Sequence, residues 1–151
     1  MRLWLDTEFN GYLGELISIG IVDEHGKEYY GVRRWYDPKP WVRANVIPVL
    51  NGEKETDPVL QRALEAFLKP YSHCHIIVDW PEDIAYFCNF IVTGPGERIE
   101  TPPLTFEIKR HLPNTKDTSL IPHNALEDAK ALRRSDEDDG SHPTRRYVDQ
   151  D

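Results

Sequence analysis

The stretch Arg2-Leu3-Trp4-Leu5-Asp6-Thr7-Glu8 places its leucines and its acids at alternate positions, which predicts a β-strand near the start of the chain. Its two leucines share one face of that strand, whereas Trp4, Asp6 and Glu8 share the other. Because Trp4 marks a face that packs against the protein, the two acids are not expected in open solvent. They lie about 7 Å apart and repel each other unless a cation lies between them. The stretch therefore predicts a sheet with a metal site, the alternative being two strand-end acids that face water.

Apolar runs and turn residues outward from this strand predict an α/β chain. Strands over 15–22 and 27–35 flank the turn Asp23-Glu24-His25-Gly26 and form an antiparallel hairpin. The remaining elements are helices over 57–69, 80–92 and 124–134, and strands over 75–78 and 104–108. This order predicts a mixed sheet, a three-strand antiparallel meander plus parallel strands, flanked by helices.

Composition bounds the domain organisation. The chain has 151 residues, of which 39% are hydrophobic, and we expect one domain over 1–134 and an acidic, flexible tail over 135–151. No apolar run approaches the length of a membrane span, and Asp6 comes too early for a signal peptide. Cys74 and Cys88 are too few for a disulfide framework, so we expect reduced thiols in a cytoplasmic protein, with a bond between them as the alternative.

The net charge of −8 is unfavourable for a nucleic-acid partner. Residues 135–151 carry −4 of it, which leaves −4 on the rest of the chain. Two divalent cations would neutralise that remainder. Composition alone favours an acidic enzyme that acts on small molecules, but metals and a few local Arg or Lys groups can hold a polyanion.

A third acid is predicted on an apolar helix face. In a helix over 80–91, Asp83 shares a face with two phenylalanines and an isoleucine. An unpaired acid is costly to bury there. It therefore either binds a metal or lies in the first turn, where the helix dipole favours it. The neighbouring Asp79 and Glu82 are assigned mainly to capping this helix.

The last predicted helix carries a fourth acid. Asp128 lies on the small apolar face of Ala125, Ala129 and Leu132, which favours a metal ligand over a structural acid. His123 lies on a loop just before this helix, where a neutral imidazole can take a proton from water. A lone loop histidine is usually an exposed surface residue, but the offset of five residues from Asp128 favours a catalytic one. Four acids and one histidine are the inventory of a two-metal phosphodiesterase with a histidine base.

These motifs resemble the DEDDh exonucleases over residues 1 to about 134. The resemblance rests on Asp-x-Glu near the start, the mid-chain acid Asp83 at the start of a helix, and His-x-x-x-x-Asp before the last helix. A closer resemblance, to the RNase AS-like branch, rests on the runs Glu15-Leu16-Ile17-Ser18-Ile19-Gly20 and Trp41-Val42-Arg43. The members of that branch are small, mostly dimeric 3'-5' exoribonucleases. The resemblance implies a ribonuclease H-like fold, two Mg²⁺ or Mn²⁺ ions, single-stranded RNA as substrate and a homodimer.

The resemblance also implies a role for each matching residue. Asp6 would bridge both metal ions. Glu8 and Asp128 would complete the first site, Asp83 would support the second, and His123 would be the general base. The terminal nucleotide would lie near Glu8, with Thr7 and Phe9 contacting its 3'-hydroxyl through their backbone and Leu16 forming a wedge against its base.

Other substrate contacts are predicted from residue type. Phe9 and Trp80 are the preferred base-stacking residues because both adjoin these acids. Most of the other aromatic candidates are expected in the core or at an interface: Tyr12, Trp35 and Trp41. Candidates for phosphate binding are Arg33, Arg34 and Arg43.

One departure from the family concerns Asp79, because many members carry a neutral residue four positions before the middle Asp. This acid would either add a metal contact or cap the helix. We therefore predict a metal-dependent 3'-5' exoribonuclease. The alternatives are a 3'-5' exodeoxyribonuclease of proofreading or phage type, and an inactive nucleic-acid-binding module on the same fold.

Overall fold

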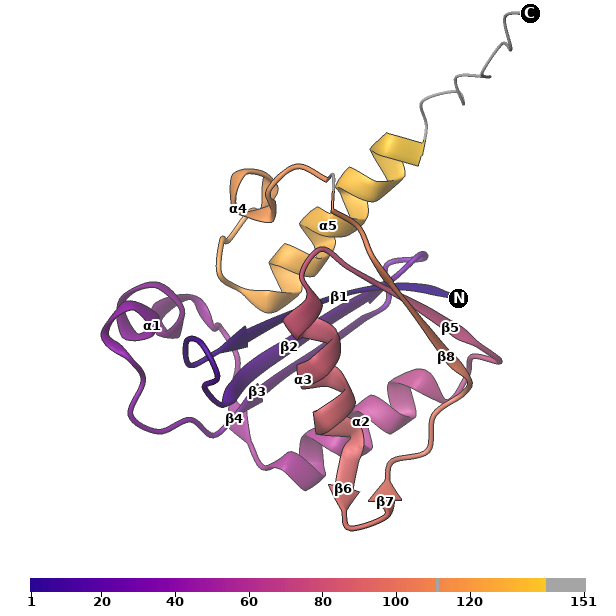
Figure 1. Cartoon of the computed structure of the whole chain (residues 1–151), viewed down its shortest axis with the longest axis horizontal. Coiled ribbons are helices and arrows are strands. Elements are labelled where there is room, and N and C mark those ends of the chain that lie inside the picture. Colours follow the sequence, from indigo (N-terminus) through magenta and orange to yellow (C-terminus); the bar gives the residue numbers. More distant parts are fainter. Residues whose placement is uncertain (111, 141–151) are drawn as a thin grey trace, which may run out of the picture.

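A six-stranded mixed sheet with helices on both faces forms the body of the protein (Figure 1). The computed structural model describes residues 1–110 and 112–140. The strand order is β4-β3-β2-β1-β5-β8. The strands are β1 (Arg2–Phe9), β2 (Leu16–Asp23), β3 (Glu28–Arg33), β4 (Lys54–Glu55), β5 (Cys74–Val78) and β8 (Leu104–Ile108).

The pairing of the strands confirms the predicted fold class. Strands β1, β2 and β3 form an antiparallel meander. Strand β5 runs parallel to β1, β8 runs parallel to β5, and the two-residue β4 runs parallel to β3. This mixed sheet flanked by helices is consistent with a ribonuclease H-like fold.

Three long helices cover the sheet, and short elements fill its edges. The long helices are α2 (Asp57–Leu68), α3 (Pro81–Ile91) and α5 (Ala125–Gly140). The short elements are α1 (Pro40–Asn45), the 3₁₀ helix η1 (Ile47–Val49), α4 (Thr115–Thr118), and the small hairpin of β6 (Val92–Gly94) and β7 (Glu97–Arg98).

The alternation predicted for β1 divides the core into two sides. Leu3 and Leu5 pack with apolar residues of α2 and α3, whereas Trp4 packs with Ala129 and Leu132 of α5. The period of two then places Asp6 and Glu8 on the α5 side of the sheet. The prediction that these acids share a face with a buried Trp4 is confirmed.

Helix α5 begins in close contact with the sheet at Gly20 of β2. A Cβ atom there would lie 2.3 Å from the backbone carbon of Ala125, far inside van der Waals contact. Gly20 is the register partner of Asp6. A residue without a side chain therefore lets the start of α5 lie directly beside the acids of β1.

Two predicted details of the helices were wrong. The pair Asp57-Pro58 predicts that Asp57 caps α2, but the N-cap residue is Thr56, without a side-chain cap bond, and Asp57 instead forms an ion pair with Arg33 at 2.7 Å. Helix α5 does not end near residue 134 but continues to Gly140. It continues because Asp136 is buried, where its carboxylate accepts hydrogen bonds from Trp4 Nε1 at 3.0 Å and from Lys109 Nζ.

The rest of the predicted tail, residues 141–151, lies outside the described residues. Cys74 and Cys88 are both free thiols, as expected. Among the helices of the described ranges, none combines the length and the apolar character needed to span a membrane.

Candidate metal centre

The five residues of the predicted site lie together in one cavity of ≈ 900 Å³. The end of β1 supplies Asp6 and Glu8, the first turn of α3 supplies Asp83, and the start of α5 supplies Asp128, with His123 just before it. Asp83 is only 2% exposed, on the same buried helix face as Phe87, Phe90 and Ile91, as its spacing predicts. Segments more than a hundred residues apart therefore meet at one point.

The acids form two groups that share one member. Asp6, Glu8 and Asp128 each offer a carboxylate oxygen such that these atoms lie within 4.8 Å of one another, and so do Asp6, Asp79 and Asp83. Three carboxylates at this distance suit a hard divalent cation, which prefers oxygen ligands. The shared position of Asp6 is the arrangement that two neighbouring cations would require.

Asp83 and Asp128 are each held through one oxygen, and these two acids and Asp6 each have a buried oxygen without a partner. Asp83 Oδ1 accepts hydrogen bonds from the backbone N–H of Thr7 at 3.1 Å and from its hydroxyl at 2.6 Å. Asp128 Oδ2 accepts one from the backbone N–H of His123 at 3.1 Å. Buried oxygens without a hydrogen-bond partner among the described residues are Asp6 Oδ2, Asp83 Oδ2 and Asp128 Oδ1. A buried acceptor without a partner costs free energy of folding, and a bound cation would supply that partner. The residues present therefore fit bound cations.

Burial and mutual repulsion disturb the titration of these acids. Burial raises the pKa of Asp6 well above its ordinary range, and the charges of its acidic neighbours add to this effect. The pKa of Glu8 is raised to about 9, chiefly by burial and then by the charge of Asp128. Burial likewise raises the pKa of Asp83 to about 7. The ionised cluster therefore needs a positive charge beside it.

His123 is held beside the acids in an unusual backbone conformation. Its φ of 69° lies in the left-handed region, which non-glycine residues rarely adopt. The indole of Trp41 packs edge-on against its imidazole, with ring centroids 5.1 Å apart. Burial lowers the pKa of His123, and the nearby Lys116 lowers it further, so both effects favour the neutral imidazole. A neutral imidazole is the form that can accept a proton.

The expectation that Asp79 and Glu82 cap helix α3 was wrong. The N-cap residue is Trp80, and no side-chain cap bond is present. Glu82 Oε2 instead accepts a hydrogen bond from Trp80 Nε1 at 2.7 Å. Asp79 lies one residue too early to cap, because Pro81 is already the first helical position, and its carboxylate joins Asp6 and Asp83 in the second group.

The structure brings three of the four predicted substrate contacts to the cavity. Thr7 lines it while bonded to Asp83, and Phe9 lines it while its ring stacks on that of Tyr86 at 4.6 Å. Trp80 also lines it and is 58% exposed. Leu16 does not: it is 5% exposed, packs in the core and lines a different pocket.

The cavity wall contains one aromatic candidate in unexpected surroundings and three basic residues that the sequence did not indicate. Trp41 is 54% exposed and packs against His123, although core or interface positions were expected for most of the aromatic candidates in its set. Lys109, Arg110 and Lys116 bring positive charge to the same wall. Lys109 and Arg110 directly follow β8, and Lys116 lies in the four-residue helix α4, so none of them belongs to a stretch long enough to show a periodicity.

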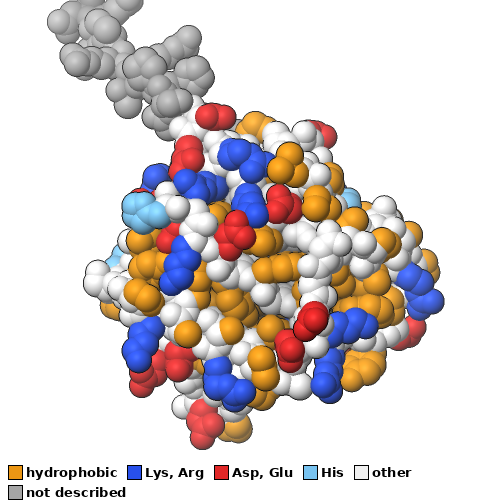
Figure 2. Space-filling view, turned by 180° about the vertical axis from the view of Figure 1, so that it is seen from behind, with side chains coloured by type: hydrophobic (Ala, Val, Ile, Leu, Met, Phe, Trp, Pro, Cys, Tyr) orange, Lys and Arg blue, Asp and Glu red, His pale blue; other side chains and the backbone are white. Residues whose placement is uncertain are grey.

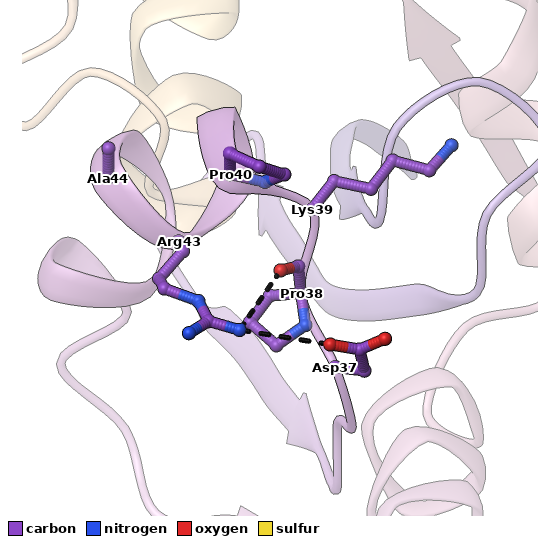
Figure 3. A pocket seen from close by; sticks show the side chains of 6 residues that line it. All are labelled: Asp37, Pro38, Lys39, Pro40, Arg43 and Ala44. Carbon is purple, nitrogen blue, oxygen red and sulfur yellow. Dashed lines mark hydrogen bonds and ion pairs between the residues drawn. The ribbon is translucent and has the colours of Figure 1, made fainter.

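The arginines considered for phosphate binding lie elsewhere. Arg33 donates to both carboxylate oxygens of Asp57, at 2.8 and 2.7 Å. Figure 3 shows the guanidinium of Arg43 turned toward the backbone oxygen of Pro38 at 3.5 Å and toward the carboxylate of Asp37 at 3.8 Å. The pocket that Arg43 lines does not include the acid groups.

Acidic and basic side chains are interspersed on the side opposite to the view of Figure 1 (Figure 2). That face is not uniformly negative, although the chain carries a net charge of −8. The net charge alone therefore does not argue against an anionic ligand, because the local positive charges of the cavity wall matter more.

Two curated proteins match part of the chain. Both are named 3'-5' exoribonuclease and come from Mycobacterium tuberculosis, strains CDC 1551 / Oshkosh and ATCC 25618 / H37Rv. Each is 51% identical over 55 residues, and the match spans only a third of their length and a third of this chain. The chain matches none of the protein-family profiles with which it was compared.

Proposed function

We propose that this protein is a metal-dependent 3'-5' exoribonuclease of the DEDDh type, which removes nucleotides from the 3' end of single-stranded RNA. The observation that carries the proposal is the meeting of Asp6, Glu8, Asp83, Asp128 and His123 in one cavity, with three orphaned carboxylate oxygens. The names of the two partial relatives support RNA as the substrate class.

The four acids would hold two divalent ions, Mg²⁺ or Mn²⁺. Glu8 and Asp128 would bind one ion, Asp83 the other, and Asp6 both. When bound, such ions stabilise the charge that develops on the attacking and leaving oxygens of an in-line phosphoryl displacement. The hydrogen bonds from Thr7 and His123 orient two of these carboxylates before any ion arrives.

His123 would act as the general base. Burial favours the neutral form of its ring, which lines the cavity together with Asp128, so a ring nitrogen can take the proton of the attacking water. Trp41 packs against the ring and limits its rotation. The left-handed backbone at this residue directs the chain into α5 while the side chain stays at the cavity.

The walls of the cavity suit a single nucleic-acid strand. Lys109, Arg110 and Lys116 provide positive charge for backbone phosphates. Phe9 and Trp80 offer aromatic faces on which unpaired bases stack regardless of sequence. The closer resemblance to the RNase AS-like branch adds a homodimer in the cytoplasm to the proposal.

A gel time course with 5'-labelled single-stranded RNA and DNA of matched sequence tests the proposal. We expect a ladder that shortens from the 3' end in Mn²⁺ or Mg²⁺, is faster on RNA, and is abolished by EDTA. The variant His123→Ala should be slowed by about 10²–10⁴-fold and still bind Mn²⁺.

The outcomes separate the alternatives. Faster degradation of DNA would indicate an exodeoxyribonuclease. Intact RNA and DNA, together with measurable binding of either strand, would indicate an inactive binding module and refute the proposed activity. Loss of Mn²⁺ binding in His123→Ala would contradict the role of this residue as base.

A further inference from the structure

Asp79 is an acid of the cavity to which the four-acid scheme assigns no role. It directly follows β5 and precedes Trp80, the N-cap residue of α3. One of its carboxylate oxygens lies within 4.8 Å of oxygens of both Asp6 and Asp83. The Asp79 carboxylate therefore lies beside those of two acids that are already proposed to bind metal.

Structural explanations for this acid do not hold. It does not cap α3, which has no side-chain cap bond. Within the described ranges, no Lys, Arg or His forms an ion pair with it. As a third carboxylate within 4.8 Å of Asp6 and Asp83, it adds repulsion to a crowded site. Repulsion between these carboxylates lowers the stability of the folded protein. A bound cation would relieve it, which explains why an acid occupies this position.

An independent observation concerns the oxygens that face Asp79. Asp83 is 2% exposed, and Thr7 occupies its Oδ1 through two hydrogen bonds. Asp83 Oδ2 is buried without a hydrogen-bond partner among the described residues, and so is Asp6 Oδ2. Asp83 therefore has a single oxygen left for the second group, and a hard cation bound there requires more oxygen ligands than Asp6 and Asp83 provide alone.

We propose that Asp79 is a fifth metal ligand and completes the second group as Glu8 and Asp128 complete the first. The inference rests on the proposed function, because it concerns the same cavity. Its consequence is that the second ion binds the free protein without help from a substrate phosphate, since three carboxylates surround it. Affinity for divalent cations rises with the number of charged ligands, so a neutral residue at position 79 should weaken this ion alone.

Titration of the metal-free protein with Mn²⁺ in the absence of nucleic acid tests the inference. Free Mn²⁺ is measured by electron paramagnetic resonance, and binding heat by calorimetry. We expect the unchanged protein to bind two ions. In Asp79→Asn, the affinity for one ion should fall by about tenfold or more while the other stays the same.

Two further variants make the result specific. Glu82→Gln is the matched control, because this acid lies in the first turn of α3, outside both groups, and glutamine can still accept the hydrogen bond of Trp80. It should bind both ions as the unchanged protein does. Asp79→Ser is measured beside Asp79→Asn, with circular dichroism on each, so that the conclusion does not depend on one replacement folding.

The inference and the proposed function fail in different ways. Two ions with unchanged affinities in Asp79→Asn, or a single ion in the unchanged protein, would overturn the role of Asp79 and leave the nuclease proposal standing. Two bound Mn²⁺ ions without any degradation of RNA would refute the nuclease and leave the fifth ligand in place.

Discussion

The two acid groups share Asp6 but are assembled in different ways. In the first, Glu8 comes from β1 and Asp128 from α5, at opposite ends of the described chain. Their meeting depends on the close approach of α5 to Gly20. In the second, Asp79 and Asp83 come from one short segment at the start of α3, which hydrogen bonds through Asp83 to Thr7 of β1. Long-range packing thus builds the first group, and local structure builds most of the second.

Removal of the shared acid should have the largest effect. Asp6→Asn takes a charged ligand from both groups, so we expect RNA degradation to fall by about three orders of magnitude or more. Mn²⁺ binding should weaken for both ions. Asp37→Asn, which replaces an exposed acid outside both groups, is the control. Retention of both ions at unchanged affinity would show that Asp6 does not join the two groups.

A packing change should break the first group alone. In Gly20→Ala the new Cβ would collide with the backbone of Ala125, so α5 must shift and carry His123 and Asp128 away from β1. We expect a rate lower by about 100-fold and weaker binding of one Mn²⁺ ion, with the other retained. Overpacking should also lower the free energy of unfolding by about 1–3 kcal/mol.

The control for this variant is Gly94→Ala, where the nearest atom to the new Cβ is the end of the Glu97 side chain at 3.3 Å. It should leave both rate and metal binding unchanged. Equal loss of both ions in Gly20→Ala would contradict the separate assembly of the two groups.

The pH dependence of stability should distinguish the groups in the metal-free protein. The folded state raises the pKa of Glu8 from 4.5 to about 9 and that of Asp83 from 3.8 to about 7. Because the folded carboxyls keep protons that the unfolded ones release, the free energy of unfolding falls as pH rises through these ranges. Above pH 7 the remaining decline comes from Glu8 and from Asp6, the acid that both groups share and whose pKa burial raises well above its ordinary value.

Urea unfolding in EDTA between pH 5 and pH 9 measures this dependence. Glu8→Gln should make the decline between pH 7 and pH 9 smaller, whereas Asp83→Asn should leave most of it. Saturating Mn²⁺ should reverse the trend, because metal binding requires the ionised carboxylates. A stability that rises with pH in the metal-free protein would refute this assignment of the protons.

The smallest effect on the rate is expected from a residue outside both groups. Asp136→Ala leaves the buried Trp4 indole N–H and the Lys109 ammonium without their shared acceptor. We expect a loss of about 2–3 kcal/mol of stability and a rate reduced only a few-fold through movement of Lys109. Thermal melting and the gel time course measure the two effects. Glu137→Ala, which removes an exposed acid paired with Arg133, should change neither.

The predictable parts of the site lie on regular elements. Alternation in β1 placed Asp6 and Glu8 beside Trp4, and helical spacing placed Asp83 and Asp128 on apolar faces, as the structure has them. The position of Asn124 just before the apolar face of α5 predicts an N-cap, and its Oδ1 accepts a hydrogen bond from the backbone N–H of Glu127 at 3.1 Å. Each of these features is local, so a few neighbouring residues determine it.

The residues that were misplaced depend on contacts between distant segments. The sequence around Asp79 has the form of a capping box, but Pro81 starts α3 one residue later and frees this acid for the cavity. Trp41 and Lys116 lie in the short helices α1 and α4, which contain too few residues for a repeat that would indicate a functional face. Arg33 pairs with Asp57, which no spacing rule connects to it.

By itself the sequence determined the α/β class, the face of β1 that carries the acids, and the set of four acids and one histidine, because strand and helix periods are properties of the local chain. Only the tertiary structure decided that the acids divide into two groups, that Asp79 belongs to one of them, and that basic residues line the same cavity. Those features follow from how closely α3, α5 and the segment after β8 pack around the end of β1, and that distance is set by Gly20 and by the buried contacts of Thr7 and Asp136.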